Sequence, residues 1–392
     1  MTTTLASNPA GSMSPTRLLS RWRPLTLADG LASPQDNFLL LRTLAAAAVI
    51  YGHGYAMVAH RGPPEIFTWM GWGIYSGAMA VDMFFLISGF LVTGSYLRRR
   101  NLPEFAWARL LRLLPAYAVC LLGCAFVLGA IYTSLPLGDY LTRAATRDYV
   151  WTNLRFSTNM SWQLPGVFVD SPRRDTINGS IWTLPAEARM YLWVALVGAL
   201  GILSRRAWCN LLLAGLFVCG LIAPDHLLLV PLTAFVRPAA FFALGAFCHV
   251  NREFVPASGW LVLALAVLTW LLRATPLYAF AFGLSEAAFV FWFAYRTRWH
   301  GYNRFGDYSY GLYLWGFPIQ QVIAHHLPNA MPLANAALSL PLAGVLAIAS
   351  WHLVEKPVLA WKSLPRRIAY RLGASRPPAV DVGTNELAPK AK

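Results

Sequence analysis

The fold class of this chain is decided by the run Phe38-Leu-Leu-Leu-Arg42-Thr-Leu-Ala-Ala-Ala-Ala-Val-Ile-Tyr-Gly-His53-Gly-Tyr55. The run is about as long as a helix that crosses a bilayer, yet it contains two ionisable side chains. From Arg42 to His53 a helix turns by about 1100°, which is about 20° past three full turns, and rises by about 16 Å. Both side chains therefore share one face at different depths. Ionisable groups inside membranes are rare and usually functional, so both are candidate site residues.

The composition of the whole chain indicates an integral membrane protein. Hydrophobic residues make up 57% of the 392 residues and charged residues only 12%, whereas soluble domains are usually about a quarter charged. We predict an all-α bundle of about ten transmembrane helices, at about 38–59, 77–97, 113–133, 181–203, 208–223, 229–249, 259–272, 276–295, 308–327 and 333–354. Residues 1–36 are then a mostly disordered cytoplasmic segment, 37–362 the membrane domain, and 363–392 a basic, disordered cytoplasmic tail.

The basic residues predict how the bundle is oriented. With the N-terminus inside, the cytoplasmic pieces hold 22 of the 32 Lys and Arg residues, the outside pieces hold seven, and three lie within spans. This excess fits the positive-inside rule with both termini in the cytoplasm, most simply in a bacterial cytoplasmic membrane. The net charge of +15 is then explained by topology and by attraction to anionic membrane lipids, without a nucleic-acid partner.

The second predicted span brings a carboxylate to the depth of His53. It contains Val81-Asp82-Met-Phe-Phe-Leu-Ile-Ser88-Gly89 and runs from outside to inside. A carboxylate bonded to one imidazole nitrogen raises the basicity of the other, as a general base requires. We therefore expect Asp82 to orient His53, the alternative being a polar pair that only locks two helices. Glu187 enters the same layer from the fourth span, where pairing with Arg189 would give it a structural role instead.

Three arginines are predicted near the cytoplasmic surface. Arg109 and Arg112 are three residues apart, hence on one helical face, and Arg42 lies at a similar depth. Guanidinium groups bind phosphate oxygens bidentately, so the three predict a phosphate clamp. Anchoring to anionic lipid is the alternative. Two further buried charges, Arg237 and Glu286, also need partners.

Six motifs, in order from about residue 36 to 362, resemble those of the membrane acyltransferase-3 family. They are Arg42 with His53, Val81-Asp82-Met-Phe-Phe-Leu-Ile-Ser-Gly-Phe, Arg109-Leu-Leu-Arg112 with Leu114-Pro115-Ala-Tyr117, Trp182-Thr-Leu-Pro-Ala-Glu187 with Tyr191, Phe305-Gly306-Asp-Tyr-Ser309-Tyr310-Gly311-Leu-Tyr313-Leu-Trp315, and Val354-Glu355-Lys356-Pro357. That family comprises integral membrane enzymes that O-acylate carbohydrates and other metabolites, such as bacterial surface polysaccharides and Nod factors. The donor is generally acetyl-CoA or a related acyl-CoA.

The resemblance implies a role for each candidate residue. Catalysis would involve His53, Asp82 and Glu187, the acyl-CoA phosphates would be held by Arg42, Arg109 and Arg112, and the substrate side would be formed by Ser88, Trp182 and Tyr191. No metal and no permanently bound cofactor are expected. The acceptor would be a hydroxyl-bearing carbohydrate or a lipid-linked glycan. Glu355 would be a structural residue, or one that supports a site residue, at the last cytoplasmic helix end.

One position departs from the family pattern. Many members have Trp-His in the ninth span, whereas this chain has Trp315-Gly316. Gly316 has no side chain that could perform the proton transfer of that second histidine. His325 or His326, at the outer end of the same span, is the available displaced substitute.

Two other classes of function compete with the enzyme. Buried Asp, Glu, His and Arg side chains also mark the substrate and proton paths of transporters and channels. A membrane scaffold would need the same polar network only for structure. Release of coenzyme A that depends on a hydroxyl acceptor distinguishes the enzyme, whereas uptake without chemistry favours transport.

Overall fold

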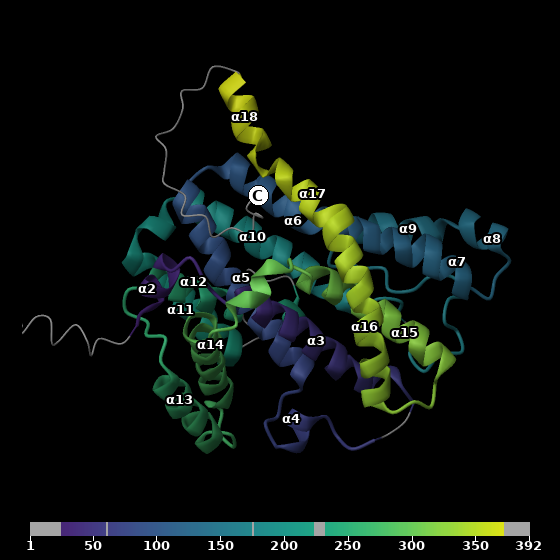
Figure 1. Cartoon of the computed structure of the whole chain (residues 1–392), viewed down its shortest axis with the longest axis horizontal. Coiled ribbons are helices and arrows are strands. Elements are labelled where there is room, and N and C mark those ends of the chain that lie inside the picture. The colour runs from purple at the N-terminus through teal and green to yellow at the C-terminus, as the bar shows by residue number, and fades with distance from the viewer. Residues whose placement is uncertain (1–24, 60–61, 175, 223–231, 372–392) are drawn as a thin grey trace, which may run out of the picture.

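The computed structural model describes residues 25–59, 62–174, 176–222 and 232–371, and apart from two isolated bridges their regular structure is helical (Figure 1). The predicted disordered segment before residue 25 and the end of the predicted tail after residue 371 lie outside these ranges. Within them, α2 (Leu27–Ala32) precedes the first span and α18 (Leu364–Arg371) follows the last.

A helix lies in each of the ten predicted ranges. They are α3 (Phe38–Met57), α5 (Ser76–Arg99), α6 (Leu102–Leu122), α10 (Thr183–Ala199), α11 (Arg206–Ile222), α12 (Val236–Val250), α13 (Gly259–Leu271), α14 (Tyr278–Arg296), α15 (Ser309–His326) and α16 (Pro332–Ser350). Six helical stretches in the described ranges are long and apolar enough to cross a membrane, at 38–57, 76–99, 102–132, 233–250, 278–296 and 332–371, and α11 and α13 are shorter apolar helices. The count of ten crossings and the orientation stay predictions.

Short helices connect or extend these elements. They are α4 (Ile66–Trp69), α7 (Gly129–Tyr132), α8 (Leu137–Thr142), α9 (Ala144–Leu154) and α17 (Lys356–Leu359). π-helical segments at Gly123–Leu128 and Trp351–Glu355 continue α6 into α7 and α16 into α17. Such segments are frequent at functional sites, and the second one ends at Glu355.

Two glycines bring α5 and α12 into backbone contact. A Cβ atom added at Gly89 would overlap the Phe242 carbonyl oxygen, and one added at Gly245 would overlap the Leu86 carbonyl oxygen. In lipid, helices associate largely through close van der Waals packing, which small residues permit. Gly89 and Gly245 therefore form a close-packing site between α5 and α12.

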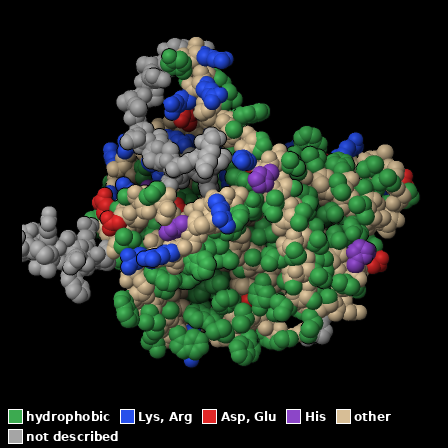
Figure 2. Space-filling view, viewed as in Figure 1, with side chains coloured by type: hydrophobic (Ala, Val, Ile, Leu, Met, Phe, Trp, Pro, Cys, Tyr) green, Lys and Arg blue, Asp and Glu red, His purple; other side chains and the backbone are tan. Residues whose placement is uncertain are grey.

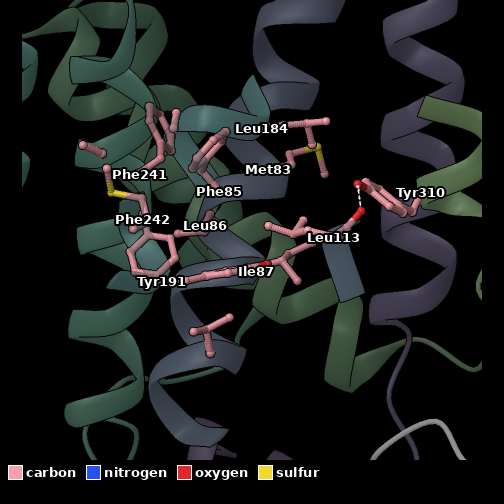
Figure 3. Packing of buried hydrophobic residues seen from close by; sticks show 14 of the residues in the cluster. Met83, Phe85, Leu86, Ile87, Leu113, Leu184, Tyr191, Phe241, Phe242 and Tyr310 are labelled. Atoms are coloured by element: carbon pink, nitrogen blue, oxygen red, sulfur yellow. Dashed lines mark hydrogen bonds between the residues drawn. The ribbon is translucent and has the colours of Figure 1, made fainter. Parts of the chain in front are cut away.

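Apolar side chains fill the bundle and also cover its outside. In Figure 3, Phe85 and Leu86 of α5 lie beside Phe241 and Phe242 of α12. On the outside, Trp260 of α13 is 81% exposed and Val345 of α16 is 65% exposed, as expected for helices whose solvent is lipid. Figure 2 shows hydrophobic side chains over much of the face in view, with most of the visible Lys and Arg toward the end that carries α18.

Candidate active site

Six of the nine candidate residues line one cavity of about 100 Å³ between α3, α5, α6, α10 and α15. These six are Arg42, Ser88, Arg109, Arg112, Glu187 and Tyr191. The remaining wall is mostly apolar or aromatic and includes Phe84, Leu184, Tyr310 and Tyr313. We call this space the arginine cavity. Tyr310 is fixed in the wall by a hydrogen bond of 2.8 Å from its hydroxyl to the Leu113 carbonyl oxygen (Figure 3).

Asp307 ties two of the three arginines together. Its Oδ2 atom accepts hydrogen bonds from Arg42 Nη1 at 2.8 Å and from Arg112 Nη2 at 2.6 Å. Its Oδ1 atom accepts one from the Ser309 hydroxyl, which fixes the carboxylate at the start of α15. Asp307 is fully buried. Burial by itself would raise the pKa of Asp307, but Arg112 and Arg42 more than offset it and hold that pKa well below its ordinary value.

Glu355 extends this network to the last helix. Its Oε2 atom lies 3.4 Å from Arg112 Nη1, and its Oε1 atom accepts a hydrogen bond of 3.0 Å from Ser350. Arg112 is thus shared by two carboxylates from different parts of the chain. Its guanidinium has less capacity left for a phosphate than the sequence alone suggests.

Arg109 has a different environment from the other two. In the described part of the chain it forms no ion pair, and its Nε atom is buried without a hydrogen-bond partner. Its guanidinium carbon lies 5.9 Å from the Phe105 ring centroid and 5.7 Å from that of Tyr191. Tyr191 in turn donates a hydrogen bond to Glu187. Aromatic faces hold a cation without neutralising it, so Arg109 is the guanidinium best placed to receive an anionic group.

His53 lies outside the set of described residues that line the arginine cavity. Its ring packs edge-on against Phe317 of α15, with the centroids 5.3 Å apart. Within the described residues its Nδ1 atom is buried without a hydrogen-bond partner.

Asp82 does not bond to His53, contrary to our expectation. Both of its oxygens accept hydrogen bonds from Arg237 of α12, at 2.6 to 3.0 Å. Asp82 is 1% exposed, and a buried carboxylate is best stabilised by a bidentate guanidinium. This pair also gives Arg237 the partner that the sequence required. Glu286 of α14 is 6% exposed, and neither of its oxygens has a hydrogen-bond partner among the described residues.

Gly316 packs tightly against the helix that carries His53. A Cβ atom at this position would lie 2.6 Å from Ile50 Cγ1, so a histidine here would require at least the Ile50 side chain to shift. The two histidines that we considered as substitutes for the family histidine have other partners. His325 Nδ1 lies 3.2 Å from the Ser171 hydroxyl, and His326 Nε2 lies 3.1 Å from the Tyr132 hydroxyl.

Trp182 lines a second and larger cavity of about 840 Å³. Its described lining contains three large aromatic side chains, polar groups and one arginine, namely Trp162, Trp182, Phe235, Thr158, Ser161, Gln163, Thr176 and Arg173, with Met160, Gly179, Leu232 and Ala234. We call it the tryptophan cavity. Trp182 and Phe235 are stacked with their ring centroids 6.4 Å apart. Trp182, which we expected on the substrate side with Ser88 and Tyr191, therefore lines a different cavity from these two residues.

Sequence reasoning did not single out Asp307 as a site residue. Asp307 lies inside a quoted motif, directly before an apolar helix. The local sequence feature that could have indicated a fixed carboxylate there is Ser309, two residues later, whose hydroxyl bonds to it. The three arginines at one depth also need a counter-charge, which could have indicated a buried acid close to them. Arg237 was recognised as needing a partner, but the sequence did not indicate which acid would pair with it.

Comparison with known proteins identifies the family of this chain. The model of the acyltransferase-3 family, described as an acyltransferase domain, matches residues 36–354. The chain belongs to the acyltransferase-3 family. The resemblance inferred from its six motifs is thereby confirmed, and the arginine cavity lies within the matched region.

Two curated relatives of this family member were found. A protein of Shigella phage Sf6 named O-acetyl transferase is 28% identical over 338 residues, which cover 82% of this chain and 95% of the relative. Nodulation protein 10 of Rhizobium leguminosarum bv. viciae is 32% identical over 167 residues, which cover 40% of this chain and 42% of the relative. No solved structure matches this chain.

Proposed function

We propose that this acyltransferase is a multi-pass O-acetyltransferase of the bacterial cytoplasmic membrane, with ten spans and both termini in the cytoplasm. It moves an acetyl group from acetyl-CoA to a hydroxyl of a carbohydrate or related cell-envelope acceptor. The observation that carries the proposal is the arginine cavity, where three guanidinium groups from α3 and α6 meet and Arg109 has no ion pair among the described residues. The name of the phage relative supports acetyl as the transferred group.

In this proposal the donor lies along α3. Arg109 holds the coenzyme A phosphates together with Arg42 and Arg112, which Asp307 keeps in place. The pantetheine arm then extends along the rise of about 16 Å from Arg42 to His53. A thioester already has a good leaving group, so placement and one base suffice chemically.

His53 takes the proton of the acceptor hydroxyl or carries the acyl group transiently. Its unpartnered Nδ1 atom fits a group that acts on a bound substrate. Asp82 is given no step in this scheme, since its carboxylate is bonded to Arg237. Glu187 and Tyr191 line the donor side, and Trp182 the acceptor side.

The experiment uses the full chain in lipid nanodiscs with labelled acetyl-CoA and separate fractions of cell-envelope polysaccharide, oligosaccharide and lipid-linked glycan. We expect release of coenzyme A that depends on one fraction, together with an alkali-labile acetyl ester detected by mass spectrometry. The His53→Ala variant is the matched negative control. Unconsumed acetyl-CoA with every fraction would refute the proposal, and solute uptake by proteoliposomes without coenzyme A release would instead support a transporter.

A further inference from the structure

The arginine cavity and the tryptophan cavity approach each other at the start of α10. Gly179 and Trp182 line the tryptophan cavity, and Thr183 lines the arginine cavity. These residues belong to the 3₁₀ turn Gly179–Trp182 and to the first residue of α10. Four residues of helix rise by about 6 to 8 Å. About one layer of side chains therefore separates the two spaces at this point.

Tyr313 of α15 occupies that layer. Its hydroxyl donates a hydrogen bond of 2.8 Å to the Ser180 carbonyl oxygen and lies 2.7 Å from the Thr183 hydroxyl. Its ring packs edge-on against Phe84 of α5, with the centroids 5.5 Å apart. Tyr313 also lines the arginine cavity and is only 7% exposed. One side chain thus closes the arginine cavity on the side of the tryptophan cavity.

Phe317, one turn further along α15, completes this wall. A Cβ atom added at Gly179 would overlap its ring, so the ring lies directly on the backbone that borders the tryptophan cavity. The same ring also packs against the imidazole of His53. The wall therefore joins the two cavities to the proposed base.

We propose that Tyr313 and Thr183 form a gate between the arginine cavity and the tryptophan cavity, and that the gate opens when acyl transfer takes place. This inference rests on the proposed function, in which donor and acceptor approach from the two cavities. Tyr313 is a positioning residue in this scheme. Its two hydrogen bonds link neutral groups, which are the weaker kind and can break during turnover.

The closed gate also protects the donor from water. If it leaks, water adds to the thioester carbon, the carbon–sulfur bond breaks, and the products are acetate, free coenzyme A and one proton. A closed active site excludes this side reaction. Opening the wall permanently should therefore raise hydrolysis relative to transfer.

The test measures access from each membrane face with a thiol reporter. Ser88→Cys places a thiol of similar size in the arginine cavity, in a Cys219→Ala background because Cys219 is the exposed native cysteine of the described chain. Sealed vesicles of both orientations are treated with a charged, impermeant methanethiosulfonate reagent. With Tyr313 present, we expect labelling from one face only. Tyr313→Ala should raise the rate at which the reagent labels the new cysteine from the opposite face at least tenfold.

Two further variants keep the result interpretable. Tyr313→Phe keeps the ring and loses both hydrogen bonds, so its labelling from the opposite face should lie between those of the parent and Tyr313→Ala. This variant decides the test if the alanine variant does not fold. Tyr132→Ala removes a tyrosine that contacts His326 instead and should label as the parent does. Acetyl-CoA hydrolysis without acceptor should rise at least tenfold relative to transfer in Tyr313→Ala.

The gate and the proposed function fail in different ways. Labelling needs neither acetyl-CoA nor an acceptor. One-sided labelling of both Tyr313 variants would overturn the gate and leave the acetyltransferase standing. If Tyr313→Ala is labelled from both faces but the parent protein never consumes acetyl-CoA, the gate is supported and the proposed acetyltransferase function is refuted.

Discussion

Arg112 and Asp307, 195 residues apart in the chain, form an ion pair of 2.6 Å, and the same carboxylate oxygen also binds Arg42. One buried acid therefore fixes two guanidinium groups that the sequence places on different helices. Because Asp307 is fully buried, its removal leaves both cations short of a counter-charge. The network connects the stability of the bundle to the geometry of the proposed donor site.

Asp307→Asn should lower the free energy of unfolding by about 3 to 5 kcal/mol, the usual cost of breaking a buried ion pair. Because the pKa of Asp307 is lowered in the folded protein, its carboxylate stabilises the fold fully above about pH 4. This stabilisation is lost only as the pH falls below about 4 toward the lowered pKa of the folded state. Thermal unfolding in detergent should therefore show the same deficit at pH 5 and pH 8. A deficit at pH 8 alone would show that another group is responsible.

Arg109→Gln should weaken acyl-CoA binding without destabilising the protein. A hydrogen bond to a charged group contributes roughly 1.5 to 3 kcal/mol, so the Michaelis constant for acyl-CoA should rise by about 10-fold to 150-fold. Lysine should restore little, because it lacks the bidentate fork. Arg205→Gln, at an exposed arginine, is the matched control. Unchanged acyl-CoA binding in Arg109→Gln would favour a lipid-anchoring role.

His53→Ala should lower acetyl transfer by about 100-fold to 10,000-fold, as loss of a general base typically does. Because its Nδ1 atom has no partner among the described residues, the thermal stability should change little. Quantitative mass spectrometry of the acetylated product, at matched protein levels, provides the measurement. His352→Ala, at an exposed histidine, should stay active, and comparable activity in both variants would remove His53 from the mechanism.

Asp82 and Arg237 should behave as one unit. Double-mutant cycles on thermal stability with Asp82→Asn and Arg237→Gln should give an interaction energy of about 0.5 to 3 kcal/mol, because the two groups are in direct bidentate contact. The corresponding cycle between Asp82→Asn and His53→Ala should be close to additive. Strong coupling in this second cycle would restore Asp82 as the partner of His53.

Gly89→Ala should cost about 1 to 3 kcal/mol of stability, because the new methyl group meets the α12 backbone and forces the helices apart. Gly215→Ala on α11 is the matched control, since a Cβ there meets nothing within 4 Å. That change should be neutral or stabilising by up to about 1 kcal/mol, the helix propensity gained. Equal effects of both variants would contradict close packing of α5 on α12.

The ten helical ranges and the family followed from local sequence. A long apolar run must form a helix in lipid to satisfy its backbone polar groups, so hydropathy placed α3, α5 and α15 close to their observed bounds. The six motifs, which are also local features of the sequence, identified the family. The predicted convergence of Arg42, Arg109 and Arg112 was also correct, because helix period and depth along each span constrain which faces and levels can meet.

The pairing of charges across helices was decided only by the tertiary structure. The sequence offered His53 as the partner of Asp82 and named no acid for Arg237, whereas the packing of α5 on α12 at Gly89 and Gly245 brings Asp82 and Arg237 together. In the same way, the start of α15 carried Asp307 to Arg42 and Arg112. Depth along a span follows from counting residues, whereas which neighbouring helix a side chain faces depends on how the helices pack, and single-chain periodicity does not contain that information.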